Sequence, residues 1–183
     1  MEIDFGTYHH STKQESENFR KRISELFKKA FSSVIQDPSK VLDAGCGLGF
    51  LSSVVMDYFK NTIVYGVDNF QDTNLKDNSI EKLRKNISIL GFDKRFYIIS
   101  SDLTGIPFRD NSFDVIVSNL VYHNIKDRDV ALQELVRILK PYGFILLGDL
   151  FFYRLQLKNV DIVSEIYDEN LDKYKIVILK KVI

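Results

Sequence analysis

Three glycines and two acidic residues in the first half of the chain have types and spacings that suit ligand binding. Gly45, Gly47 and Gly49 alternate with other residues just after Asp43, and Asp68 follows further along. Glycine has no Cβ, so a backbone rich in it can turn tightly and approach a ligand closely. An acid about 20 residues beyond such glycines accepts hydrogen bonds from the ribose hydroxyls of a nucleoside. The pattern predicts a nucleoside-binding loop with Asp68 as its ribose ligand.

The acid ahead of the glycines bears on the charge of the ligand. The dinucleotide fingerprint is G-x-G-x-x-G, whereas this chain has G-x-G-x-G. A carboxylate at Asp43 would repel a phosphate and attract a cation or an amine. We therefore expect a nucleoside with a cationic group rather than NAD. A tight strand-to-helix turn without any ligand is the alternative interpretation.

The elements around these residues indicate an α/β fold, because apolar strands alternate with amphipathic helices. Strands are expected at residues 41–42, 62–67, 96–100, 113–119, 144–147, 160–166 and 174–182, and helices at 11–34, 51–58, 80–90 and 127–139. Residues 140–143 are expected to end the last helix before the fifth strand. Residues 151–158 read as a short helix or an irregular segment. The final two strands form a predicted hairpin through an acidic turn at 168–172.

The N-terminal region reads as an irregular arm, residues 1–10, followed by the long amphipathic helix. Apolar residues at three- and four-residue intervals give this helix a buried face. Its other face carries Arg20, Lys21, Arg22, Lys28 and Lys29. We interpret these charges as a solvated surface, with a landing surface for an acidic substrate as the alternative.

The order of motifs over residues 41–147 resembles the class I S-adenosylmethionine (SAM)-dependent methyltransferases, in particular the small-molecule branch that includes ubiquinone and menaquinone C-methyltransferases. The matching strings are VLDAGCGLGF, YGVD, SSDLTGIPFRDNSFDVIVSNLVYHNI and RILKPYGFILL, in which Tyr142 replaces the more usual glycine. The resemblance implies a Rossmann-like three-layer α/β sandwich with a mostly parallel seven-stranded sheet whose last strand is antiparallel. A single methyltransferase domain over residues 1–183 is expected, with the arm and helix at 1–38 and the SAM-binding core at 39–183.

The resemblance also implies SAM as cofactor, S-adenosyl-L-homocysteine (SAH) as product and Asp102 as the partner of the adenine amino group. The residues expected to bind the cofactor are Asp43, Gly45, Cys46, Gly47, Gly49, Asp68, Asn69, Ser101, Asp102, Leu103, Asn119 and Leu120.

Methyl transfer needs a base only if the acceptor atom starts protonated. His123 is the nearest candidate base, because histidine ordinarily titrates near neutrality, and Tyr122 beside it is a second candidate catalytic residue. A packing or capping histidine is the alternative for His123. The residues expected to contact substrate are Tyr8, His10, His123 and Asp149. The arm must fold back for the first two to do so, and a frayed terminus is the alternative.

Composition excludes some classes of protein and disfavours others. The chain of 183 residues has 25 Lys and Arg against 25 Asp and Glu. This balance disfavours affinity based on phosphate neutralisation. No run of about 18 apolar residues suggests a membrane span, and no signal-peptide pattern begins the chain. A single cysteine excludes an intramolecular disulfide, and no Cys/His cluster suggests a metal. We expect a cytoplasmic protein of unspecified oligomeric state.

Several functions remain open beside methyl transfer to a small molecule. An NAD(P)-dependent oxidoreductase is disfavoured by Asp43 and the glycine spacing. A SAM-binding protein without activity, acting as a regulator or partner subunit, is a second alternative. A tRNA or rRNA methyltransferase is a third, supported only by the basic face of the first helix. Asn119 is not followed by the prolines that accompany amide and exocyclic-amine methylation, so that chemistry is not expected.

Overall fold

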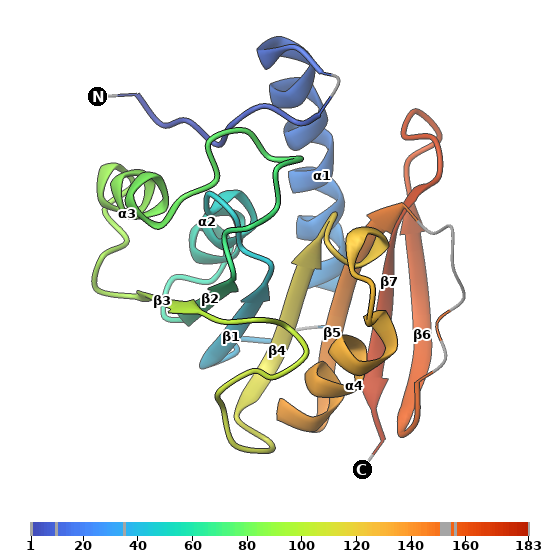
Figure 1. The fold of residues 1–183 in the computed structure, drawn as a ribbon. Coiled ribbons are helices and arrows are strands. Elements are labelled where there is room, and N and C mark those ends of the chain that lie inside the picture. The colour runs from blue at the N-terminus through green and yellow to red at the C-terminus, as the bar shows by residue number, and fades with distance from the viewer. Residues whose placement is uncertain (1, 10, 35, 151–154, 156, 183) are drawn as a thin grey trace.

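A seven-stranded sheet forms the centre of the protein. The computed structural model describes residues 2–9, 11–34, 36–150, 155 and 157–182 (Figure 1). The strand order is β3-β2-β1-β4-β5-β7-β6, with β1 to β5 parallel and β7 antiparallel to both of its neighbours. The predicted sheet and its antiparallel last strand are confirmed. The strands are β1 (Lys40–Ala44), β2 (Ile63–Asp68), β3 (Phe96–Ser100), β4 (Phe113–Asn119), β5 (Leu139–Leu150), β6 (Val160–Tyr167) and β7 (Tyr174–Lys181).

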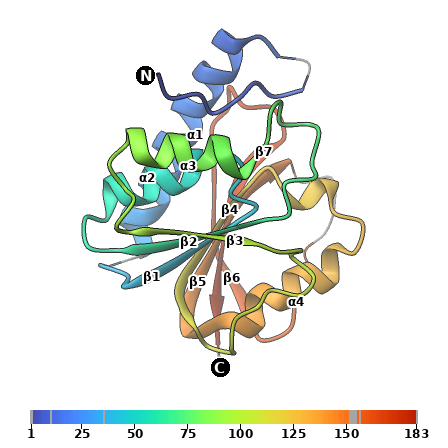
Figure 2. The ribbon, with the colours of Figure 1, turned by 60° about the vertical axis from the view of Figure 1, so that its left-hand side comes forward.

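Helices cover both faces of the sheet, which confirms the three-layer architecture. One face carries α1 (Lys13–Val34), α2 (Phe50–Tyr58) and α3 (Ile80–Ile89), and the other carries α4 (Arg128–Ile138) (Figure 2). A short 3-10 helix, η1 (Tyr122–Asn124), links β4 to α4. No described helix has the length and apolar character to cross a membrane.

Two cores lie on either side of the sheet, because successive side chains of a strand point to opposite faces. In β4, Val115 and Val117 pack toward α1 and α2, whereas Ile116 packs toward α4. Central parallel strands are buried on both faces, so they are apolar without alternation. This explains why short apolar runs in the sequence indicated where the central strands lie.

The fifth strand differs from the expected residues 144–147. It begins at Leu139, which pairs with Phe113, and the pairing resumes with Phe144 opposite Val115. Between these pairs one residue of β4, Asp114, lies opposite four residues of β5, 140–143, and a bulge takes up the surplus. Tyr142 adopts a left-handed backbone there, with φ 63°. Residues 140–143, expected to end the preceding helix, lie within the strand as this bulge.

The first helix also differs from expectation in one residue. Arg20 is only 6% exposed, whereas Lys21, Arg22 and Lys29 lie at the surface. Arg20 follows the buried Ser16 by four residues and precedes the buried Ile23 by three, so it belongs to the inner stripe of α1. Most of residues 151–158, expected as a short helix or irregular segment, lie outside the described residues.

Candidate functional site

A cavity of about 1110 Å³ opens at the carboxyl ends of the parallel strands, where ligands bind in open sheets of this kind. Its lining contains most of the residues singled out from the sequence: Tyr8, Asp43, Gly45, Cys46, Gly47, Asp68, Asn69, Asp102, Leu103, Asn119, Leu120 and His123. The structure thus brings together residues that are far apart in the chain.

Four of the singled-out residues do not line the cavity. Gly49 instead begins α2 with φ 87°, and a Cβ there would lie 2.7 Å from Leu83 Cδ1. The Ser101 hydroxyl donates within its own loop. Tyr122 is fully buried in the core beneath α4, so its side chain is not placed to touch a substrate. Asp149 is buried behind His123. His10 lies outside the described residues.

The glycine loop is fastened to the end of β2. The backbone N–H groups of Gly45 and Cys46 both donate to the Val67 carbonyl, at 2.7 and 3.1 Å. The Gly47 N–H donates to Asp68 Oδ2 at 2.8 Å. A Cβ on Gly45 would collide with the Val121 side chain, and its φ of 77° favours glycine independently. The loop therefore packs closely against both neighbouring strand ends.

The Asp68 carboxylate holds this loop and keeps acceptor capacity for a ligand. Its other oxygen, Oδ1, accepts the Phe70 N–H at 2.6 Å. Each carboxylate oxygen has two lone pairs, so both oxygens can still accept from ribose hydroxyls. Burial raises the pKa of Asp68 above its ordinary value.

Asp102 lies at the adjacent end of β3. Its Oδ1 accepts from the backbone N–H and the hydroxyl of Thr104, at 2.8 and 2.6 Å, and these bonds lower its pKa. The Ser101 backbone N–H next to it donates to the Asp68 carbonyl at 3.1 Å. The loops after β2 and β3 are therefore joined beside the Asp68 carboxylate.

The buried carboxylate of Asp43 leaves one acceptor atom unpaired. Its Oδ2 accepts the Ser52 hydroxyl at 2.6 Å, while Oδ1 has no hydrogen-bond partner. Burial raises the pKa of Asp43 to about 7. An unsatisfied buried acceptor costs free energy, and an ammonium group in the cavity would relieve that cost.

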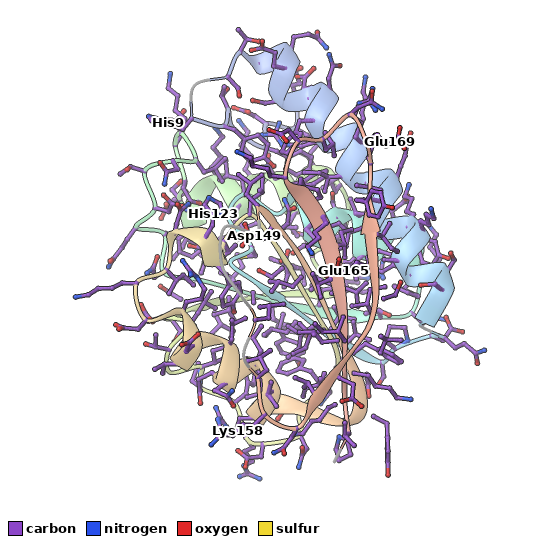
Figure 3. The ribbon with its side chains drawn as sticks, turned by 90° about the vertical axis from the view of Figure 1, so that its right-hand side faces the viewer. His9, His123, Asp149, Lys158, Glu165 and Glu169 are labelled. Atoms are coloured by element: carbon purple, nitrogen blue, oxygen red, sulfur yellow. The ribbon has the colours of Figure 1, made fainter. Side chains whose placement is uncertain are left out.

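His123 and Asp149 form a pair at the ends of β4 and β5 (Figure 3). The distance between His123 Nδ1 and Asp149 Oδ1 is 2.5 Å, and the His123 backbone N–H donates to Oδ2 at 3.0 Å. Asp149 is fully buried, and its Oδ1 also accepts the Leu150 N–H. With Nδ1 engaged, Nε2 is the nitrogen left for a substrate. The sequence singled out both residues as substrate contacts, and His123 also as a candidate base, but did not predict that they form a pair.

The N-terminal arm packs over the cavity. Tyr8 pairs with Leu75, and the His9 N–H donates to the Asn74 carbonyl at 3.0 Å. Asn86 of α3 exchanges hydrogen bonds with the Asp4 backbone and donates to the Leu48 carbonyl. Most of the arm, expected to be irregular, is thus attached to the loop after β2 and to α3 rather than frayed.

Residues 42–147 match the family model described as "Methyltransferase domain". This match covers more than half of the chain and includes the glycine loop, Asp68 and Asp102. The chain belongs to the class I SAM-dependent methyltransferases. Its unpaired Asp43 oxygen and its close-packed glycine loop fit the ammonium group and the nucleoside of that cofactor.

Curated relatives of this methyltransferase include a malonyl-[acyl-carrier protein] O-methyltransferase of Methylovorus sp., 28% identical over 131 residues, which are 72% of this chain and 43% of that protein. A fatty-acid O-methyltransferase of Mycolicibacterium smegmatis is 26% identical over 74% of this chain and 46% of that protein. The chain therefore spans less than half of these relatives. A solved structure of a protein from Methanococcus maripaludis has the same fold, with a TM-score of 0.70, 18% identity and coverage of 97% and 98% of the two chains.

Replacing Asp43 with asparagine should change how the stability of this methyltransferase depends on pH. The pKa of Asp43 is raised from 3.8 to about 7 in the folded state, so its ionisation in the unfolded state lowers stability as pH rises from about 4 to 7. The penalty reaches about 4 kcal/mol above that window. Asp43→Asn should remove this slope and weaken SAM binding. Denaturant unfolding between pH 4.5 and 8 measures the change.

Asp93→Asn is the matched control, because Asp93 is exposed and lies outside the cavity. Its stability curve should run parallel to that of the wild type. An Asp43→Asn curve that also runs parallel would show that Asp43 is ionised at little cost in the folded protein.

Proposed function

We propose that this protein transfers the methyl group of SAM to an oxygen atom of a small organic acceptor. The observation that carries the proposal is the His123–Asp149 pair, because His123 lines the same cavity as the glycine loop and Asp68 and the buried Asp149 holds its ring. The cofactor supplies a methyl group activated by a sulfonium. The residues of the protein need only bind the cofactor and the acceptor, orient the acceptor oxygen toward the methyl group and remove its proton.

Three parts of the cavity would hold the cofactor. Asp68 would accept the ribose hydroxyls, and Asp102 with Leu103 would contact the adenine. Asp43 and the glycine loop would meet the cationic amino-acid end, where the unpaired Oδ1 supports the assignment. Fixing donor and acceptor in one geometry lowers the barrier by about 7 to 11 kcal/mol in well-oriented reactions.

His123 would act as the base toward a hydroxyl acceptor. Its Nε2 takes the proton as the oxygen attacks, while the buried Asp149 carboxylate fixes the ring and stabilises the imidazolium. Proton transfer by a positioned side chain contributes about 10²- to 10⁴-fold in rate. Asp149 is thereby a positioning residue rather than the substrate contact suggested by the sequence.

A carboxylate acceptor is the second candidate. The names of the relatives specify O-methylation of a malonyl-[acyl-carrier protein] and of a fatty acid, and the buried Arg20 lines the cavity. Such an acceptor arrives ionised and needs no base. A nucleic-acid acceptor is less favoured, since the chain has no net charge.

The first test compares the shift in thermal midpoint caused by SAM, SAH, NAD and NADP. A ligand at 100 times its dissociation constant stabilises by about 2.7 kcal/mol. We expect SAM and SAH to raise the midpoint and the dinucleotides to leave it unchanged.

A screen of hydroxyl and carboxylate compounds for SAH formation then tests transfer. A shift with dinucleotides alone would refute the proposal, and SAM binding without turnover on any compound class would favour a non-catalytic subunit.

A further inference from the structure

The side chain of Asn119, at the end of β4, is held by a tyrosine of β7. The Tyr174 hydroxyl donates to Asn119 Oδ1 at 2.7 Å. Tyr174 is only 2% exposed, and among the described residues its hydroxyl has no other hydrogen bond. If the amide were turned over, this hydroxyl would accept instead, and its own hydrogen would be buried without a partner, which costs free energy. The Tyr174 hydroxyl therefore sets the orientation of the Asn119 amide.

The sheet leaves space for this contact at Gly148, which lies opposite Asn119 in the register of β4 and β5. A Cβ at Gly148 would collide with the Tyr174 hydroxyl oxygen and approach two ring carbons of Phe27 to 3.0 Å. Gly148 does not have a positive φ, so the absence of a side chain is what this position requires. The Gly148 carbonyl also accepts the Leu120 N–H at 2.8 Å, which fixes the backbone just after Asn119.

The N–H2 end of the amide is directed away from Tyr174, because the oxygen and the nitrogen of an amide lie on opposite sides of one carbon. Asn119 lines the cavity, whereas Tyr174 does not, so the nitrogen is the end that meets a ligand. An N–H2 group donates hydrogen bonds and does not accept them. It gains nothing from an ammonium or a sulfonium, for which the Asp43 carboxylate is suited. An oxygen atom of the acceptor suits it better.

Asn119 and His123 reach the cavity from opposite sides of the sheet. Tyr174, which holds Asn119, belongs to the core beneath α1. His123 is held by Asp149, and Asp149 follows Gly148, whose missing side chain would face Phe27 of α1. Since successive side chains of a strand alternate, Asp149 points to the side of α4. The two groups therefore approach an acceptor from different directions and would contact two different oxygens.

We propose that Asn119, oriented by Tyr174, donates a hydrogen bond to a second oxygen of the acceptor, beside the oxygen that is methylated. The acceptor class is then a molecule with two neighbouring oxygens, such as a hydroxyl beside a carbonyl, or a carboxylate, rather than a simple alcohol. Tyr174 is a positioning residue in this arrangement. The resemblance assigned Asn119 to the cofactor instead. The inference rests on the proposed function, because it concerns the acceptor of that same site.

The first experiment titrates 2-hydroxyacetophenone and 2-ethylphenol into SAH-saturated protein. The two probes have similar shapes and the same phenolic hydroxyl, but only the first has a carbonyl oxygen beside it. The wild type should bind 2-hydroxyacetophenone about threefold to tenfold more tightly, the range for one neutral hydrogen bond. In Asn119→Asp this ratio should fall to one or below, because a carboxylate keeps the bond from Tyr174 but has no N–H to donate. In Tyr174→Phe the ratio should fall part of the way, since the amide can turn over.

Asn61→Asp and Tyr167→Phe are the matched controls, because they make the same substitutions at exposed positions outside the cavity. Both should keep the wild-type ratio. Affinity for SAH should stay close to that of the wild type in Tyr174→Phe and Asn119→Asp. A loss of SAH affinity with an unchanged ratio of the two probes would assign the amide to the cofactor and overturn the proposal.

The second experiment observes the amide directly, by proton–nitrogen correlation NMR of the SAH complex. The side-chain N–H2 resonances of Asn119 are identified by their loss in Asn119→Asp. They should shift when 2-hydroxyacetophenone is added and stay in place with 2-ethylphenol. Resonances that respond alike to both probes, or a wild type without preference for the carbonyl compound, overturn the proposal. A wild type that binds neither SAM nor SAH refutes the proposed function instead.

Discussion

Replacing His123 with alanine is expected to lower turnover by about 10²- to 10⁴-fold, the range for loss of a general base. Affinity for SAH should stay close to that of the wild type, because the glycine loop and Asp68 are untouched. The measurement is SAH formation on an acceptor found with the wild-type protein, together with calorimetric titration of SAH. A fall in turnover with constant affinity is the signature of a residue that acts on the acceptor.

Asp149→Asn tests the other half of the pair. The amide cannot supply the negative charge that stabilises a protonated ring, so turnover should fall although the ring stays nearly in place. His123→Gln guards against misfolding, since it keeps a side-chain donor near the buried Asp149, which also retains two backbone N–H groups. Turnover unaffected in all three variants would exclude the base and favour an acceptor that arrives ionised.

The parts of the site that could be predicted are those fixed by neighbours in sequence. A buried strand followed by alternating glycines has few backbone solutions, and an acid at the end of the next parallel strand must lie beside that turn. Asp43, Gly47 and Asp68 therefore meet in the structure as the spacing predicted. In the same way, the alternation of expected strands and helices along the chain indicated an α/β fold around a sheet.

Other features depend on contacts between distant segments, which a linear pattern does not specify. Because Arg20 is charged, we placed it on the solvated face of the first helix. Its spacing from Ser16 and Ile23, however, matches the buried stripe of that helix. The pairing of His123 with Asp149 could have been inferred, since His123 follows β4 and Asp149 lies at the carboxyl end of β5, and these strands prove to be neighbours. The bulge at Tyr142 had no comparable signal, because turn residues fit a bulge equally well.

Asp68→Ala is expected to weaken SAH binding by about a hundredfold or more. Two hydrogen bonds to a carboxylate would be lost, each worth about 1.5 to 3 kcal/mol. The Gly47 and Phe70 N–H groups would also lose their acceptor, so the loop would be less well organised for binding. Calorimetric titration of SAH measures the loss, and a melting curve reports whether the variant is folded.

Two comparisons separate ribose recognition from damage to the loop. Asp93→Ala makes the same substitution at an exposed position outside the cavity and should bind SAH as the wild type does. The 2′-deoxy analogue of SAH should bind the wild type more weakly than SAH does. In Asp68→Ala the two ligands should bind equally, because the partner of the missing hydroxyl is already gone. If the variant still distinguishes them as the wild type does, another residue holds the ribose and Asp68 serves only to shape the glycine loop.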